Sequence, residues 1–292
     1  MKILYVSNSE KNYRTHGVLN DYLNDLLFYS LYVNPDVDIT DSTRISHMYI
    51  SEKYNVCENK LWGKGFTSCF LIENDSKINR DNIEEKIRNK YYDYIIYGSI
   101  WRCEDYYELV SSCYANNKII IVDGEDKTDI SNFVEKHLYF KRELIYEYKN
   151  LVPIHFAIPD IKICRHKPQK SQQFAKSIPY LNTNNSYIFN NEKDYYCDYQ
   201  KSEYAITMKK AGWDCMRHYE IISNYCMPLF LNIEQLPKTT MTNFDRNLLK
   251  KCNQSFLDEN LYQETLEEIY DYLVNNLTTT KLSQYFLESI VQ

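Results

Sequence analysis

Residues 204–237 contain the side chains whose types and spacing are best suited to chemistry. The segment reads YAITMKKAGWDCMRHYEIISNYCMPLFLNIEQLP, which predicts a strand, a turn with glycine, a helix and a buried strand. Arg217 and Glu220 are three residues apart and would share one helix face. Arginine pairs bidentately with phosphate oxygens, and glutamate accepts hydrogen bonds from a diol. This combination suits a sugar nucleotide; the alternative is a surface ion pair worth a few tenths of a kcal/mol.

The turn before this helix adds further candidates for binding an anion. Lys209 and Lys210 would face a diphosphate held at the helix N-terminus, where free backbone N–H groups favour negative charge, although a solvated pair of lysines is the alternative. Gly212 permits a tight turn or a close approach of a ligand. Trp213 either anchors the core or stacks on a base.

The first half of the chain supplies candidates for acid–base chemistry. Asp123 and Glu125 follow the buried run KIIIV, at the end of a strand where a general base could meet an acceptor hydroxyl. Turn and helix-cap carboxylates are the alternative. His16 follows the first predicted strand and has a suitable pKa for a base, although a lone histidine is usually structural. Arg102 and Arg142 are candidate anion contacts, or else ordinary surface arginines.

The elements that must position these residues alternate between strand and helix, which predicts parallel sheets with helices on both faces. In the first half the predicted strands are Lys2–Ser7, Tyr94–Tyr97 and Lys118–Val122, with helices over residues 18–31 and 104–114. In the second half the predicted strands are 187–189, Tyr204–Met208 and Met227–Leu231, the helices are 192–202 and 215–224 with Asp214 as N-cap, and residues 165–177 form a loop.

We therefore predict an α/β chain with two alternating units, followed by C-terminal helices. The first unit comprises residues 1–152 and the second residues 153–292, whose last helix would pack back on the first unit. Residues 36–93 show no clear pattern, with weak strand signals only at 48–50 and 69–72.

Composition narrows the possible functions. The net charge of -6 disfavours a surface that coats nucleic acid. The nine cysteines include no CxxC pair, which argues against a structural zinc site and favours reduced thiols in the cytoplasm. No apolar stretch approaches the roughly 20 residues that span a bilayer, so any membrane association would be peripheral.

Taken together, these motifs resemble GT-B glycosyltransferases, and more narrowly the family-1-like proteins of bacterial surface-polysaccharide clusters and large viruses. The resemblance rests on GWDCMRHYEI with the following PLF and IEQLP, and extends upstream through DGED at 123–126, YFKREL at 139–144 and PIHFAIP at 153–159. It covers about the last two thirds of the chain. The first third matches only in its Rossmann-like start.

The resemblance implies two Rossmann-like domains that face each other across a cleft, with residues 1–152 binding the acceptor and residues 153–292 binding the nucleotide sugar. It also implies a glycosyltransferase for glycan biosynthesis that moves a hexose or pentose from a nucleotide-sugar donor to a hydroxyl acceptor, without a metal or other cofactor. The acceptor would be a glycan, a lipid or a protein-linked sugar. Relatives usually have a small residue where this chain has Tyr225, which would narrow the donor pocket. That departure and the short chain leave a catalytically degenerate nucleotide- or glycan-binding module as the alternative. Nucleic-acid modification on the same scaffold is disfavoured by the acidic charge. The oligomeric state is left open.

Overall fold

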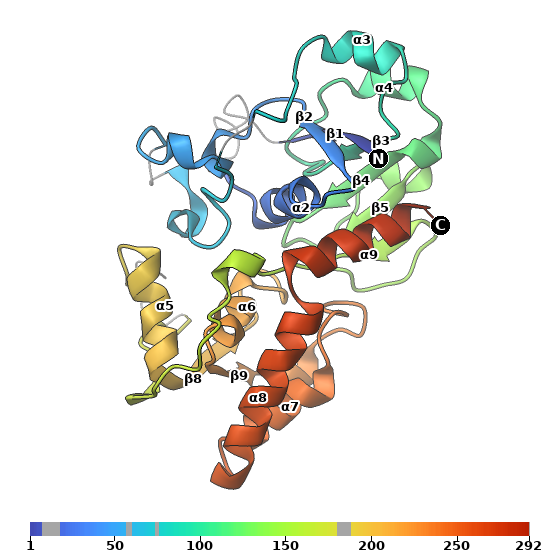
Figure 1. The fold of residues 1–292 in the computed structure, drawn as a ribbon. Coiled ribbons are helices and arrows are strands. Elements are labelled where there is room, and N and C mark those ends of the chain that lie inside the picture. The colour runs from blue at the N-terminus through green and yellow to red at the C-terminus, as the bar shows by residue number, and fades with distance from the viewer. Residues whose placement is uncertain (8–17, 57–59, 74–75, 180–187, 292) are drawn as a thin grey trace.

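The computed structural model describes residues 1–7, 18–56, 60–73, 76–179 and 188–291. These residues form two parallel sheets, one of six strands in the order β2-β1-β3-β4-β5-β6 and one of three in the order β7-β8-β9. Figure 1 shows the two sheets in separate halves of the molecule, with α8 leading from the second half to α9 on the first. The predicted fold class, α/β with two parallel sheets and C-terminal helices, is confirmed.

The first sheet is buried on both faces because its central strands β1, β3 and β4 are mostly apolar. Its strands are β1 (Lys2–Val6), β2 (Asp38–Asp41), β3 (Tyr94–Tyr97), β4 (Ile119–Asp123), β5 (Leu138–Lys141) and β6 (Leu151–Pro153). Along β1, Ile3 and Tyr5 enter one hydrophobic cluster and Leu4 and Val6 the other, as the two-residue period of a strand requires. Helices α2 (Tyr22–Tyr32) and α9 (Thr279–Val291) cover the first face, and α3 (Ile83–Arg88) and α4 (Tyr107–Cys113) the second.

The second sheet is smaller and is also covered on both faces. It consists of β7 (Gln172–Phe174), β8 (Ser202–Met208) and β9 (Met227–Leu231), with α6 (Met216–Ser223) as the crossover between β8 and β9. Ala205 packs with Tyr195 and Tyr199 of α5 (Glu192–Lys201). The ring of Tyr204 lies 5.1 Å from that of Tyr262 in α8 (Glu259–Asn276), next to α7 (Arg246–Gln254).

The last helix packs against the first sheet and not against its own half. The rings of Phe140 and Phe286 are 4.7 Å apart, and Asn34 Nδ2 donates to Ser283 Oγ at 2.9 Å. The hydroxyl of Tyr94 donates to the carbonyl of Ile290 at 3.1 Å. The domain boundary at residue 152 stays a prediction, although β6 ends close to it.

Several elements differ from those that the sequence predicts. The third strand of the second sheet lies at Gln172–Phe174, inside the predicted loop, whereas Ile188 and Phe189 are irregular and Tyr187 lies outside the described residues. Strand β7 is short, partly exposed and polar, so no hydrophobic run marks it. The weak strand signals at 48–50 and 69–72 correspond to one isolated bridge between Tyr49 and Ile72. Two 3-10 turns, Ser46–Met48 and Ile50–Glu52, lie beside it. The N-cap of α6 is Cys215, not Asp214.

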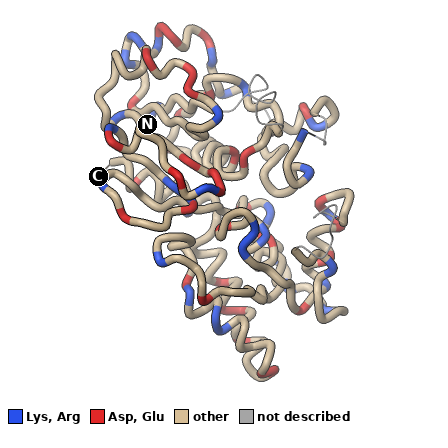
Figure 2. Tube along the Cα trace, turned by 180° about the vertical axis from the view of Figure 1, so that it is seen from behind, with Lys and Arg blue, Asp and Glu red and all other residues tan. Residues whose placement is uncertain are grey.

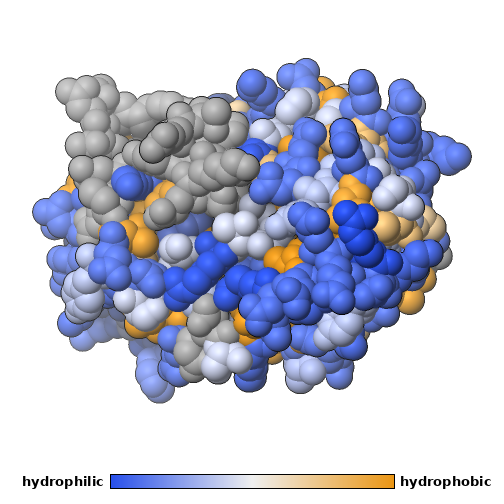
Figure 3. Space-filling model, turned by 90° about the horizontal axis from the view of Figure 1, so that it is seen from above, coloured by the Kyte–Doolittle hydropathy of each residue, from blue (hydrophilic) through white to orange (hydrophobic). Residues whose placement is uncertain are grey.

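The surface has mixed charge. Figure 2 shows Lys and Arg interspersed with Asp and Glu along the chain, and on the face seen in Figure 3 the hydrophobic residues form small separate groups between hydrophilic ones. Among the described residues, none of the helices combines the length and the apolar character that crossing a membrane would require.

Candidate active site

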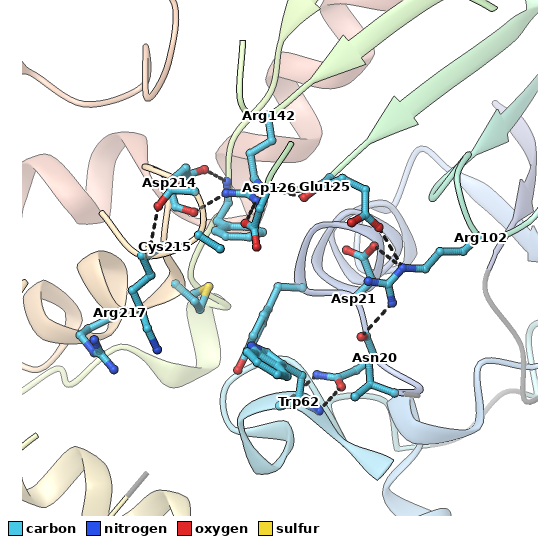
Figure 4. A pocket seen from close by; sticks show the side chains of 18 residues that line it. Asn20, Asp21, Trp62, Arg102, Glu125, Asp126, Arg142, Asp214, Cys215 and Arg217 are labelled. Atoms are coloured by element: carbon cyan, nitrogen blue, oxygen red, sulfur yellow. Dashed lines mark hydrogen bonds and ion pairs between the residues drawn. The ribbon is translucent and has the colours of Figure 1, made fainter. Parts of the chain in front are cut away.

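A cavity of about 370 Å³ lies between the two halves and is lined by both, a size typical of small-molecule sites. The first half contributes the start of α2 and the loop after β4, and the second half contributes the loop after β8 and the first residues of α6. Loops at the carboxyl ends of parallel strands are where ligands bind in such sheets. Figure 4 shows that Arg217 enters from one side and Asp21, Arg102 and Glu125 from the other.

The wall formed by the second half is basic. Lys210 and Arg217 both line the cavity. Burial lowers the pKa of Lys210, and the positive charge of Arg217 lowers it further, so the two cations repel each other in a partly desolvated site. A bound anion would relieve this repulsion. The N-cap side chain of Cys215 makes no hydrogen bond with the first turn of α6, so it does not cap the first backbone N–H groups of this helix. These groups and the helix dipole add positive potential to the same wall.

The wall formed by the first half is acidic. Asp21, Glu125 and Asp126 line it. Arg102 Nε lies 3.2 Å from Glu125 Oε1 and 3.6 Å from Asp21 Oδ2, which fixes the two carboxylates around one guanidinium. Asp21 is also the N-cap of α2, accepting from the backbone N–H of Leu23 at 3.1 Å. The side chain of Glu125 is 30% exposed, so it is accessible from the cavity. Arg102 also lines the cavity and orients these carboxylates, and its contact with a ligand anion stays a prediction.

Asp123 does not line the cavity, and its predicted catalytic role is not supported. It is fully buried, and Lys141 Nζ at 2.8 Å and the Tyr139 hydroxyl at 2.7 Å both donate to it. The indole N–H of Trp101 donates at 2.8 Å. The backbone N–H of Glu125 also donates to Asp123 at 3.1 Å, so Asp123 shapes the turn that presents Glu125.

Arg142 and Glu143 fasten the two halves together beside the cavity. Glu143 accepts the backbone N–H groups of Trp213 at 2.9 Å and Asp214 at 3.0 Å. Arg142 lines the cavity but is only 2% exposed, because it donates to the carbonyls of Gly124 at 2.9 Å and of Asp214 and pairs with Asp126 and Glu143. Arg142, predicted as an anion contact, is therefore held in ion pairs, and together with Glu143 it forms a clasp between the halves.

Gly212 is required by this clasp. A Cβ at this position would lie 2.6 Å from Glu143 Oε1 and 2.8 Å from Arg142 Nη1. A Cβ does not come this close to other heavy atoms, so a side chain here would displace Glu143 or Arg142. The predicted close approach is therefore to protein side chains, although Gly212 also lines the cavity.

Glu220 differs from the predicted ligand contact. Although it shares a helix with Arg217, it is 1% exposed and does not line the cavity. Thr67 Oγ1 donates to Glu220 Oε1 at 2.5 Å and the Tyr195 hydroxyl to Oε2 at 2.7 Å. Burial raises the pKa of Glu220. The Glu220 carboxylate therefore links Thr67, in the segment between β2 and α3, to Tyr195 of α5. It does not face the cavity.

The remaining predicted residues lie around the site. Trp213 is 8% exposed and belongs to the hydrophobic core, and Lys209 Nζ sits 5.5 Å from the centre of its ring; neither lines the cavity. Tyr225 also lies outside the cavity lining and stacks on Tyr270 at 3.6 Å, so it does not narrow this site. His16 lies outside the described residues.

Asp21, Trp62 and Asp214 are among the cavity residues that the sequence analysis did not single out. Asp21 could have been found as a capping aspartate just before the helical run that starts at Tyr22. Trp62 is 59% exposed and lines the cavity, but no periodic pattern marks it. Asp214 is buried, accepts the N–H of Phe156 at 2.8 Å and has its pKa raised to about 7, first by burial; nothing in its sequence context indicates this.

Comparison with solved structures gives a likeness of fold. No family model matches the chain, and no curated protein matches it. The chain is similar to a crystal structure of an alpha1,3-fucosyltransferase, with a TM-score of 0.41 and 9% sequence identity over 100% of this chain and 90% of that chain. At that TM-score and identity, the likeness supports no conclusion about substrates or site residues.

Proposed function

We propose that the protein is a glycosyltransferase that moves a sugar from a nucleotide-sugar donor to a hydroxyl acceptor. The observation that carries the proposal is the opposition of two walls in one cavity: the cations Lys210 and Arg217 on one side and the carboxylates Asp21, Glu125 and Asp126 on the other. Transfer from a sugar diphosphate with inversion at the anomeric carbon needs both, an anion site for the leaving group and a base for the acceptor. The sequence resemblance to GT-B enzymes agrees with this assignment.

The donor would bind at the second half, with its diphosphate between Lys210, Arg217 and the N-terminus of α6. As the bond from the anomeric carbon to the diphosphate oxygen breaks, negative charge grows on the diphosphate. Two fixed cations and the helix dipole stabilise that charge without reorganising. This arrangement would serve in place of a divalent metal. Glu220 would contact the donor only after its bond to Thr67 breaks.

The acceptor would bind at the first half, with its hydroxyl next to Glu125. Its oxygen attacks the anomeric carbon while its proton passes to the Glu125 carboxylate. Arg102 holds Glu125 in place. Trp62, held by Asn20 through its backbone N–H at 2.6 Å, presents an exposed ring at the cavity on which the apolar face of a sugar could pack.

The first experiment compares two adjacent lysines. A panel of sugar nucleotides is tested for a rise in Tm, which a specific ligand produces by mass action. We expect a donor to stabilise the wild type and the Lys209→Ala variant, because Lys209 lies outside the cavity lining. Lys210→Ala and Arg217→Ala should lose at least about tenfold in donor affinity, roughly the loss of one charged hydrogen bond.

The alternative, a binding module without turnover, is favoured by one observation: Glu220 is sequestered under Thr67. Transfer assays with glycan, lipid and protein-linked sugar acceptors distinguish the two. Donor binding with no transfer and no donor hydrolysis would favour the binding module. Equal loss of binding in Lys209→Ala and Lys210→Ala, or no stabilisation by any sugar nucleotide, would contradict the donor site itself.

A further inference from the structure

A buried group of three side chains lies beneath the acidic wall of the cavity. Asp25 comes from α2, His47 from the 3-10 turn Ser46–Met48, and Cys69 from the segment that follows the turn Trp62–Gly65. One ligand atom from each lies within 4.8 Å of the others. The three residues are 0%, 3% and 3% exposed. Within the described ranges, no other group of three His, Cys, Asp or Glu residues meets this spacing.

The carboxylate and the imidazole are already oriented toward each other. His47 Nε2 lies 2.8 Å from Asp25 Oδ2. The Asp25 carboxylate also accepts the backbone N–H of Asp21 at 3.2 Å and the amide of Asn24 at 3.0 Å. Such outer hydrogen bonds orient the ligands of protein metal sites.

The thiol is brought to this place by an unusual backbone. Gly65 has a φ of 70°, and a Cβ there would lie 2.9 Å from the Cys69 sulfur. Only glycine therefore leaves room for the sulfur at this position. The backbone N–H of Cys69 donates to the carbonyl of Gly65 at 3.1 Å, which closes the turn and holds the side chain against the Asp25–His47 pair.

The chemistry of the group matches one class of cation. Thiolate, imidazole and carboxylate are the ligand types that zinc takes in proteins, at roughly 2.0–2.3 Å, with ligand atoms then about 3.3–3.6 Å apart. The pair of Asp25 and His47 is already slightly closer than that, and small side-chain rotations would bring the sulfur into range. A divalent cation with one carboxylate, one thiolate and a neutral imidazole has no net charge, which suits a site without solvent.

A metal would also add to the packing that holds this part of the chain. Between β2 and α3 the described residues form short 3-10 turns, one bridge from Tyr49 to Ile72 and irregular backbone. Six apolar residues of this segment join the main core: Ile45, Met48, Tyr49, Leu71, Ile72 and Ile78. Val56, Leu61 and Cys69, in contrast, form only a small cluster with Leu19, and regions with little core are commonly held by a disulfide or a metal.

We propose that Asp25, His47 and Cys69 bind one structural Zn²⁺ that fastens the segment between β2 and α3 to helix α2. A water molecule or a backbone carbonyl would complete the four-coordinate shell. This site is separate from the proposed transfer chemistry, which does not use these three side chains.

The test measures metal content and spectra of the full chain, purified without chelators. We expect about one zinc per chain by elemental analysis, and a thiolate-to-metal charge-transfer band after replacement of zinc with Co²⁺. Chelator should lower the Tm of the wild type by several degrees, and added Zn²⁺ should restore it. Cys69→Ser and His47→Gln should bind less than a tenth as much zinc, and Cys69→Ser should lose the cobalt band.

Cys252→Ser is the matched control, because Cys252 is fully buried in the core of the second half. It imposes the same substitution on a buried thiol and should retain zinc and the cobalt band. If the Cys69 and His47 variants do not fold, the measurements on the wild type decide. Wild-type protein that binds no stoichiometric zinc, shows no thiolate band with Co²⁺ and has the same Tm with and without chelator would overturn the proposal, leaving a hydrogen-bonded Asp25–His47 pair beside a thiol.

Discussion

At the scale of single residues, two carboxylates in one turn have different surroundings. Asp123 is fully buried and pairs with Lys141 at 2.8 Å, whereas Glu125 is 30% exposed at the cavity beside Arg102. Removing one partner of a buried pair leaves an uncompensated charge, which costs about 3–5 kcal/mol. Removing an exposed carboxylate costs little stability. The same chemical change at the two positions should therefore affect different properties.

We predict that Glu125→Gln lowers kcat for sugar transfer at least about 10²-fold, the usual contribution of a general base, while its Tm and donor affinity stay near those of the wild type. Asp123→Asn should instead lose unfolding free energy, because Lys141 remains buried without its charged partner. Transfer kinetics and denaturant unfolding of both variants check this. A Glu125→Gln enzyme with wild-type kcat would remove Glu125 from the mechanism.

The predictability of the site residues follows from the same distinction. Residue type and position place Asp123 and Glu125 at the carboxyl end of β4 and Lys210 and Arg217 in the segment after β8, and three of these four line the cavity. Which carboxylate is solvated depends on Lys141 and Tyr139 in the neighbouring strand, and this contact between strands leaves no mark in the local sequence. Likewise, Glu220 is masked by Thr67, a residue 153 positions away.

At the scale of elements, helix α6 and the preceding turn are held together by a neutral histidine. His218 is 1% exposed; Thr207 Oγ1 lies 2.8 Å from its Nδ1, and the carbonyl of Trp213 lies 2.8 Å from its Nε2. The carbonyl can only accept, so Nε2 carries the proton and Nδ1 accepts from Thr207. A second proton would go on Nδ1 and reverse the direction of that bond, since the hydroxyl can also accept, and burial lowers the pKa of His218 to about 3.

We predict a pH dependence of stability that His218 accounts for. Between pH 6.5 and about 3 the unfolded chain takes up a proton that folded His218 does not, so the stabilisation is complete above pH 6.5 and is lost as the pH falls. Relative to His218→Gln, the wild type should lose up to about 1.4 kcal/mol per pH unit in this range. Urea unfolding at several pH values measures it, with the exposed His166→Gln as control. A constant difference between wild type and His218→Gln would contradict the assignment.

The elements themselves were predictable wherever the side chains make a long apolar run. Strands β1, β3, β4, β8 and β9 lie where the sequence predicts them, because each is buried on one or both faces. Strand β7 was missed because its residues are partly exposed and its place is set by pairing with β8. Between β2 and α3 the backbone is irregular, so the apolar residues there have no regular spacing that would reveal a helix or a strand.

At the scale of the whole molecule, a second contact between the halves lies opposite the Arg142 clasp. Lys64 Nζ donates to the carbonyl of Phe189 at 2.7 Å, and the backbone N–H of Thr67 donates to Glu192 at 2.6 Å. The Thr67 hydroxyl bonds Glu220 at 2.5 Å and lies 2.7 Å from the Tyr196 hydroxyl. Thr67 has a φ of 69°, which a β-branched residue adopts only under strain. These side-chain bonds hold that strained residue in place and set the spacing of the halves across the cavity.

We predict that Thr67→Val loosens this contact while keeping the shape and the backbone strain of the residue. Glu220 would keep only its bond to Tyr195 in a buried site, which should cost about 1–3 kcal/mol of unfolding free energy. Amide hydrogen exchange should quicken in α5 and in the 60–70 segment but not in β3 and β4. Thr67→Ser retains the hydroxyl and should behave like the wild type. If Thr67→Val unfolds and exchanges as the wild type does, the Thr67 hydroxyl does not hold the halves together, and Glu220 then has no role in their spacing.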